Sequence, residues 1–206
     1  ITNTFPYFNY FKTSDYFKPE GTVDITEYRD NLDYLFKGVD LNKLTIICDE
    51  PLPHTSASYM FAFATCQDTE VINDLFDLMP NVTDFSYMFY NAYLKEAPYI
   101  PLRAENVSYM FYNNTVMEST PSNWLQSYVF VPNSAYCYTG CVNIKLIDGI
   151  EGGIDDIPSE WGGYERQNTS MIGESLVIEK TLEREIEKFI ASGQSFHNIA
   201  PLVEQT

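Results

Sequence analysis

The sequence predicts a short α/β repeat solenoid that carries an aromatic N-terminal arm and a C-terminal α-helix. Three observations predict it: a recurring Ser-Tyr-Met-Phe motif, weaker echoes of that motif on either side, and flanks of different composition. We therefore divide the chain of 206 residues into an arm over 1–30, a repeat domain over 31–164, and a C-terminal helix with its tail over 165–206.

The motif Ser-Tyr-Met-Phe begins at Ser58, Ser86 and Ser108, in steps of 28 and 22 residues. Self-similarity at such steps indicates stacked supersecondary units. Weaker echoes at 33–36 and 135–138 extend the pattern to about five units and a closing segment. A unit this short must bury its apolar face against its neighbour. We expect the Met and Phe side chains of the three motifs to form the core: Met60, Phe61, Met88, Phe89, Met110 and Phe111.

A second apolar cluster follows each motif and predicts a strand, at 44–47, 71–72, 94–97, 116–117 and 144–147. We expect 94–97 and 144–147 to lie in one parallel sheet. Outward side chains alternate with inward ones along a strand. The sequence therefore predicts one exposed face, the recognition surface usual in such arrays, formed by Lys95, Glu96, Glu118 and Lys145.

The connectors at 81–84 and 105–108 are rich in Asn, Asp, Ser and Thr, whose side chains can cap free backbone N–H groups at the start of a helical turn. Both connectors also read as N-glycosylation acceptors, as do 113–115 and 168–170. The first two acceptor strings occupy the same place in the repeat. Their residues are therefore explained by the needs of the connector, and no glycosylation has to be assumed.

The string Asn-Val-Thr-Asp-Phe-Ser-Tyr-Met-Phe-Tyr-Asn at 81–91, with its echo at 106–113, resembles the BspA-like leucine-rich repeats of bacterial surface proteins. The segments 139–147 and 157–164 are similar to the last unit and closing sequence of such arrays in phage virion proteins. The resemblance implies a leucine-rich-repeat-like solenoid and extracellular adhesion or recognition. In this alignment, the turn ends at Cys66, Ala92, Asn114 and Cys141, where the family commonly has Cys.

The chain is strongly acidic, with 12 basic and 29 acidic residues and a net charge of −17. That field repels phosphate backbones and anionic lipid, so we expect no nucleic-acid partner. No run approaches the roughly 18 apolar residues of a membrane span, so we expect no membrane insertion. The 16 Tyr and 14 Phe residues can fill a core, line a subunit interface or stack on sugar rings.

The sequence offers little for catalysis, and we predict no enzyme, cofactor or metal. The four Cys residues lack paired CxxC spacing, which predicts free thiols at 48, 66, 137 and 141. His54 and His197 lie away from any carboxylate pair at ligand spacing. Asp155 and Asp156 could serve acid/base work, or calcium with Glu151, but the run reads first as a polar loop.

The two flanks differ from the repeats. The segment 5–11 holds five aromatic rings, and such a patch should dock on the first repeat or on a neighbouring subunit. The segment 175–191 reads as a helix with one apolar stripe, formed by Ile178, Leu182, Ile186 and Phe189. Either this helix packs on the end of the repeats, or it pairs with copies of itself or with another virion protein.

From these observations we predict a non-catalytic phage virion component of the tail, baseplate or fibres, acting in particle assembly, host-surface recognition or both. The alternative is a bacterial cell-surface adhesin module that binds a host protein or glycan. A glycosidase using a carboxylate pair is a distant third. Since the chain begins at Ile1, we expect a processed chain or part of a longer protein. Burial of apolar groups outweighs exposed charge pairs, so we expect the dominant contacts at Tyr7, Phe8, Phe11, Ile178, Leu182 and Phe189, ahead of Lys95, Glu96 and Lys145.

Overall fold

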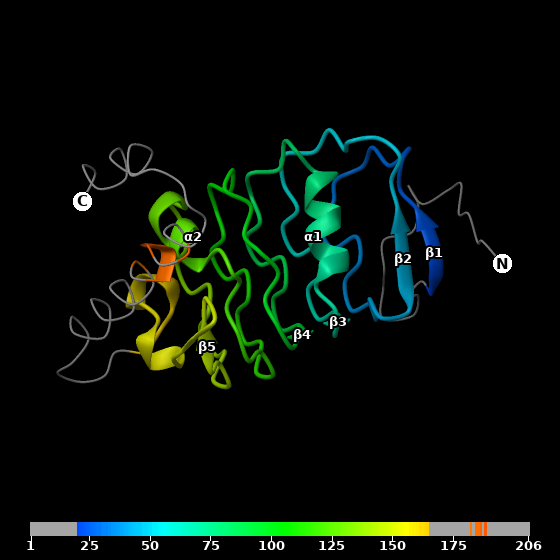
Figure 1. Ribbon diagram of the computed structural model, residues 1–206. Helices are drawn as coiled ribbons and strands as arrows, with labels where there is room; N and C mark the ends of the chain where they lie inside the picture. The colour runs from blue at the N-terminus through cyan, green and yellow to red at the C-terminus, as the bar shows by residue number, and fades with distance from the viewer. Residues whose placement is uncertain (1–19, 165–181, 183, 187, 189–206) are drawn as a thin grey trace.

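The computed structural model describes residues 20–164, 182, 184–186 and 188. Figure 1 shows short elements that follow one another along a single long axis, from β1 at one end to β5 at the other. In chain order they are β1 (Gly21–Asp24), β2 (Leu44–Ile47), β3 (Thr65–Cys66), α1 (Glu70–Asp77), β4 (Tyr93–Leu94), α2 (Trp124–Phe130), β5 (Leu146–Ile147), β6 (Ile150–Glu151), η2 (Ile154–Asp156) and η3 (Ser159–Trp161).

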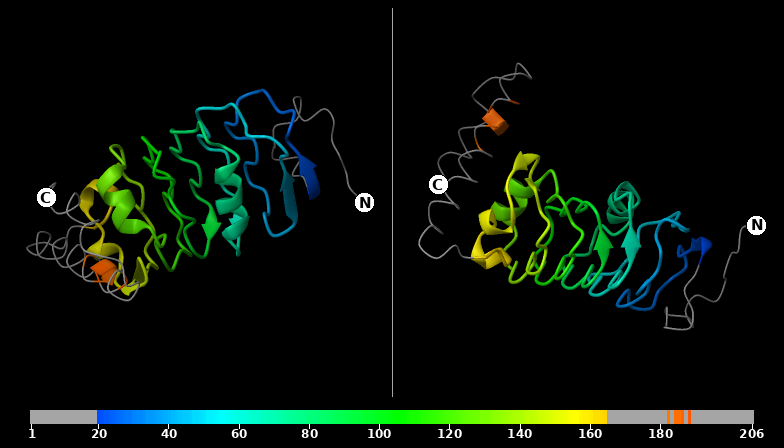
Figure 2. Two further views of the ribbon diagram at one scale, coloured as in Figure 1. Left: turned by 45° about the horizontal axis from the view of Figure 1, so that its top comes forward. Right: turned by 90° about the horizontal axis from the view of Figure 1, so that it is seen from below.

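Successive units run parallel, with each residue paired to its counterpart one unit later. β1 pairs in parallel with β2, and β3 pairs in parallel with β4. Isolated parallel bridges continue the ladder from Ser56 through Asp84 and Asn106 to Asn133. We infer that 21–164 form a short, irregular solenoid of stacked coils. Figure 2 shows α1 and α2 on the same side of these coils.

Backbone hydrogen bonds place every motif directly over the next one. The amides of Phe36, Phe61, Phe89 and Phe111 donate to carbonyls of the following unit, at 2.9, 2.9, 2.9 and 3.0 Å. The amide of Tyr138 donates in the same way to the carbonyl of Trp161, at 2.8 Å. Trp161 therefore occupies the motif position in the closing segment, and it ends the ladder of core rings.

The core prediction is confirmed, because all six Met and Phe side chains of the three motifs are 0% exposed. The rings of Phe36, Phe61, Phe89 and Phe111 stack with centroids 5.6, 5.7 and 5.7 Å apart. Each unit thus buries its ring against the ring of its neighbour, as a unit too short to hold its own core must do.

The connector side chains bind free backbone N–H groups as predicted, but at turns and not at the start of a helix. The Oδ1 atoms of Asp84 and Asn106 each accept the backbone N–H two residues later, at 3.0 Å. A separate set of hydrogen bonds holds the C-terminal end of α1. The Arg103 guanidinium donates to the carbonyls of Phe76 and Met79 at 2.6 and 2.8 Å. A cation is favourable there because the carbonyls at a helix C-terminus carry partial negative charge.

Two predicted strands are wrong. Residues 71–72 lie in the helix α1, whose buried side chains Ile72, Leu75 and Phe76 recur at helical spacing. Val116 lies in a turn, and Met117 belongs to no strand. The prediction that 94–97 and 144–147 lie in one parallel sheet is also wrong as stated, because β4 pairs with β3 and β5 with β6 in separate sheets. Isolated parallel bridges of Ser119 to Glu96 and to Leu146 are what link the two stretches. The named partner of β5, however, is antiparallel: β5 and β6 form a tight hairpin.

Two further positions need correction. β1 lies inside the predicted arm, and its pairing with β2 moves the start of the stack from residue 31 to Gly21. The residue that ends the second turn is Ala64 rather than Cys66, because Ala64 donates to Phe61 as Ala92 does to Phe89. Cys66 instead pairs with Leu94 in the parallel ladder of β3 and β4.

Replacing Tyr138 by Phe is expected to raise the free energy of unfolding by about 1–3 kcal/mol, since an unsatisfied buried hydroxyl costs that much. The Tyr138 ring is 0% exposed and stacks on Phe111, and its hydroxyl has no hydrogen-bond partner among the described residues. Burial also raises the pKa of this phenol well above its ordinary value. Urea denaturation of the purified chain measures the change.

Tyr99→Phe is the matched control, and its effect should have the opposite sign. The Tyr99 hydroxyl donates to Asp77 Oδ1 at 3.1 Å, so its loss should cost about 0.5–1.5 kcal/mol. A Tyr138→Phe variant as unstable as Tyr99→Phe would show that the Tyr138 hydroxyl is satisfied in solution.

Candidate recognition surface

The Tyr of each motif turns outward at a left-handed backbone position. Tyr34, Tyr59, Tyr87, Tyr109 and Tyr136 have φ values of 61°, 56°, 56°, 57° and 60°. Such values are uncommon for a bulky residue and cost about 1–3 kcal/mol each unless the surroundings offset them. This turn explains why Met and Phe enter the core while the preceding Tyr remains at the surface.

The five tyrosine rings form a continuous stack along the surface. Their centroids lie 4.7, 4.5, 4.6 and 4.9 Å apart, and the planes of the central three deviate by 9° and 4°. These distances match the spacing of about 4.7–4.9 Å between paired strands. Since the coils impose the spacing, ring stacking offsets part of the cost of the left-handed turns.

A second, shorter column of rings lies beside the first. Phe63 meets Tyr90 edge-on at 6.0 Å, and Tyr90 stacks on Tyr112 at 5.2 Å. Tilted contacts of 5.8 and 5.5 Å join this column to Tyr87 and Tyr109. We call the two columns together the tyrosine surface: Tyr34, Tyr59, Phe63, Tyr87, Tyr90, Tyr109, Tyr112 and Tyr136.

The tyrosine surface is solvent-facing and uncharged. Tyr34, Phe63 and Tyr136 are 41%, 44% and 53% exposed, and the other rings are partly exposed. Lys37 lies at one end, with Nζ 5.4 Å from the centre of the Phe63 ring. Burial, followed by the neighbouring phenols, raises the pKa of Tyr59. The Tyr59 phenol therefore stays neutral near pH 7, in a chain whose net charge is −17.

The stacking also decides what this surface presents to a partner. Tyr59, Tyr87 and Tyr109 each have a neighbouring ring on both faces. A partner therefore meets ring edges and hydroxyl groups rather than open ring faces. Of the three roles that the sequence left open for the aromatic residues, this geometry favours a subunit or protein interface over a platform for sugar rings.

The residues predicted to form a charged face are at the surface, and two of them neutralise each other. Lys95, Glu96 and Lys145 are exposed, and Glu118 lies between Lys95 and Lys145. Lys145 Nζ donates to Glu118 Oε1 at 3.0 Å, and this bond lowers the pKa of Glu118. Water screens an exposed pair of this kind, so it contributes little to the fold. The binding role of these residues stays a prediction.

Of the contact residues predicted at the two ends of the chain, Leu182 is the one that the structure describes. Leu182 is 50% exposed, and the described residues of the predicted helix are helical. Tyr7, Phe8, Phe11, Ile178 and Phe189 lie outside the described residues. Sequence reasoning missed the tyrosine surface, although one signal was present: each motif places a side chain with a polar hydroxyl at the same position.

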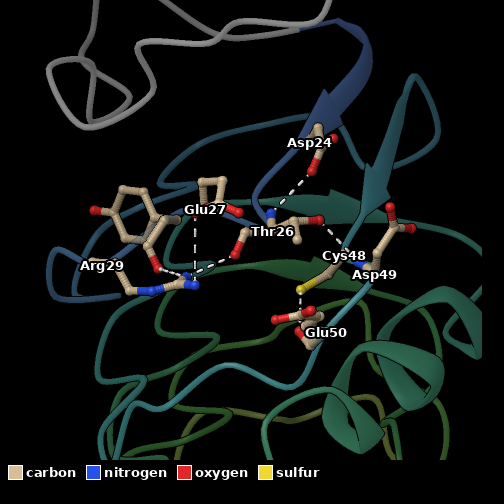
Figure 3. Close-up of polar contacts among 8 residues, drawn as sticks. Asp24, Thr26, Glu27, Arg29, Cys48, Asp49 and Glu50 are labelled. Carbon is tan, nitrogen blue, oxygen red and sulfur yellow. Dashed lines mark hydrogen bonds and ion pairs between the residues drawn. The ribbon is translucent and has the colours of Figure 1, made fainter.

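The polar cluster around Cys48 in Figure 3 is structural. Thr26 N donates to Asp24 Oδ1 at 2.9 Å, and Arg29 Nη1 donates to the Thr26 carbonyl at 2.7 Å. The Cys48 thiol donates to the Glu50 carbonyl at 2.9 Å. Burial, and then nearby carboxylates, raise the pKa of Cys48, which is the reverse of what a nucleophilic thiolate needs.

The other residues considered for chemistry are also used by the fold. The prediction of free thiols is confirmed for all four Cys residues, and burial raises the pKa of Cys66 to about 11. His54 Nε2 donates to the Asp30 carbonyl at 2.6 Å. Asp156 Oδ2 accepts the Gly153 amide at 2.9 Å and closes the predicted polar loop. His197 lies outside the described residues.

Comparisons of the chain with protein-family models, with curated proteins and with solved structures found no match. Within the described part of the chain, no helix is long and apolar enough to cross a membrane. Over the same residues, no group of three or more His, Cys, Asp or Glu side chains could hold a metal ion.

Proposed function

We propose that the chain is a non-catalytic recognition and assembly module of a phage virion, in its tail, baseplate or fibres, and that the tyrosine surface binds a protein partner. The observation that carries this proposal is the pair of stacked ring columns on the surface of the coils. Monomeric proteins rarely expose contiguous aromatic patches of this kind outside an interaction site. Tyr is also enriched at protein interfaces, because one end of the ring is apolar and the other is polar.

Pre-organisation supports a binding role. Each ring of the tyrosine surface is held by at least one neighbouring ring, so its side chain is already ordered before a partner arrives. Ordering a free side chain on binding costs about 0.5–1.5 kcal/mol, and a fixed ring avoids much of that cost. The offered edges and hydroxyls suit backbone and side-chain groups of another protein.

The virion location rests on the resemblance of 81–91, 139–147 and 157–164 to repeat arrays of surface and virion proteins. The alternative, a bacterial adhesin module, uses the same coils and the same tyrosine surface. The two proposals differ in the partner, which is another virion subunit, or a further copy of this chain, in the first and a host-surface protein or glycan in the second.

The double variant Tyr90→Ser with Tyr112→Ser is expected to reduce incorporation of the full chain into particles at least about tenfold, as the loss of two interface rings would. These two residues are suitable because neither occupies a left-handed backbone position. Incorporation is measured by mass spectrometry of purified particles that are assembled with the variant chain. Circular dichroism checks that the fold is retained.

Tyr93→Ser with Leu102→Ser is the matched control, since both side chains are exposed, at 55% and 54%, and lie outside the tyrosine surface. It should incorporate like the natural chain. Equal incorporation of both double variants would contradict the proposed surface. Binding of the natural chain to a protein or glycan on the host cells that an adhesin-bearing bacterium attaches to, without incorporation into particles, would favour the adhesin. A chain without 1–12 and 175–206 tests the terminal segments separately, and normal assembly of it would exclude them as the main contacts.

A further inference from the structure

The β5–β6 hairpin buries a carboxylate at the end of the stack. Its turn consists of Asp148 and Gly149, both at left-handed positions with φ of 49° and 74°. Asp148 is 1% exposed. Its amide donates to Thr120 Oγ1 at 2.8 Å, which ties the turn to the preceding coil. A buried carboxylate is costly unless a cation or hydrogen-bond donors compensate it.

The cation that faces Asp148 comes from the C-terminal helix. Arg184 Nη1 lies 3.4 Å from Asp148 Oδ1, and the two side chains are 29% and 2% exposed. The guanidinium lies against the turn itself, since a Cβ atom at Gly149 would be 3.1 Å from Arg184 Nη1. Neither of the two facing atoms has a hydrogen-bond partner in the described part of the chain. Charge and packing therefore hold the contact.

The apolar side chains that the structure describes in this helix do not replace this contact. Leu182 and Ile186, which the sequence predicts to pack the helix against a partner, are 50% and 37% exposed. Glu185 and Lys188 bond to each other at 2.8 Å, with side chains 42% and 51% exposed. Among the described residues, the pair of Asp148 and Arg184 is thus the buried polar attachment of the helix to the stack.

We propose that this buried ion pair is a latch that attaches the C-terminal helix to the last coil, and that protonation of Asp148 opens it and frees the helix for other contacts. A neutral Asp148 no longer attracts Arg184, whose guanidinium is then partly buried without a counter-charge. Removing one partner of a buried pair is strongly unfavourable for the other. Moving the helix into water relieves that cost.

The surroundings of Asp148 place its protonation at a pH that can be reached in an experiment. Burial raises the pKa of Asp148 from 3.8 to about 6, while Arg184 and Lys188 lower it and Glu185 raises it. The carboxylate that attracts Arg184 is present above about pH 6 and is lost below it. Because the pKa in the folded chain is raised, the fold itself favours the protonated acid. Arg184 and Lys188 lower this pKa, so their departure raises it further while the turn keeps Asp148 buried, and protonation thus favours the open contact. The hairpin should therefore remain formed while the helix leaves.

Amide hydrogen exchange of the full chain tests the latch. The exchange rate is measured on a peptide that covers 182–188 and is corrected for the intrinsic effect of pH on exchange. We expect protection at about pH 7.5 and at least about tenfold less at about pH 5, with protection of the coils unchanged. Asp148→Asn imitates the protonated acid and should abolish the protection at both pH values. Arg184→Gln should do the same from the other side of the contact.

Lys188→Gln is the matched control, because it removes a neighbouring exposed cation and leaves the buried pair intact. Its protection should keep the pH dependence of the natural chain. The proposal is overturned if 182–188 are unprotected at both pH values, if Asp148→Asn and Arg184→Gln stay protected at neutral pH, or if Lys188→Gln loses protection equally. Thermal unfolding of the coils in each variant separates loss of the latch from loss of the fold.

Discussion

Replacing Phe89 by Ala is expected to lower the free energy of unfolding by about 3–5 kcal/mol, the range for deleting a large ring from a packed core. Phe89 is 0% exposed, and its ring stacks on Phe61 and Phe111, with both centroid distances at 5.7 Å. The coils are fixed by backbone bonds on both sides of Phe89, so they cannot close around the cavity. Urea denaturation with linear extrapolation measures the loss.

Phe130→Ala provides the control, since Phe130 is 51% exposed at the end of α2. A surface substitution of this kind should change the free energy of unfolding by about 0.5 kcal/mol or less. Similar losses for the two Phe variants would mean that the ring ladder is not the core of the stack.

The core could be predicted from the sequence because its residues recur in a repeated motif. Met60, Phe61 and their equivalents recur at steps that only stacking of neighbouring units explains, and burial follows from the shortness of each unit. The closing segment was predicted on a different basis, the resemblance of 157–164 to the closing sequence of such arrays. Trp161 extends the ladder because its aromatic side chain stacks on the ring of Tyr138.

The outward turn of the tyrosines could not be predicted in this way. The sequence pattern treats Tyr59, Met60 and Phe61 alike, as three bulky residues on one turn. A left-handed φ at Tyr is rare, so no propensity points to it. Four residues after a motif tyrosine, Gly38, Asn91 and Gly140 also have positive φ, and Gly and Asn favour such values. These residues were the readable signal that each turn reverses its direction.

Short apolar pairs were ambiguous between strand and helix. Val71 and Ile72 are β-branched, and the pair alone favours a strand. The neighbouring Leu75 and Phe76 complete a helical face, and tertiary packing of that face decides the outcome. The contact of Asp148 with Arg184 was beyond sequence reasoning, because neither residue belongs to a periodic pattern.

Replacing Gly163 by Ala is expected to lower the free energy of unfolding by at least about 3 kcal/mol, the upper part of the range for forcing an atom into a packed site. A Cβ at Gly163 would lie 1.6 Å from the Ile157 carbonyl oxygen and 3.1 Å from that of Ile154. Both are backbone atoms, so no side chain can move aside. The closing segment would have to open to admit the methyl group.

This displacement should be visible in tryptophan fluorescence as well as in stability. Trp161 is 2% exposed and packs edge-on against Trp124 at 5.1 Å, so opening of the segment exposes an indole ring. Gly153→Ala is the matched control, because its Cβ would meet the Ile144 carbonyl at an ordinary 3.5 Å. It should change stability by about 0.5 kcal/mol or less and leave the fluorescence unchanged. If Gly163→Ala behaves like Gly153→Ala, the closing segment does not cap the stack as the ring ladder requires.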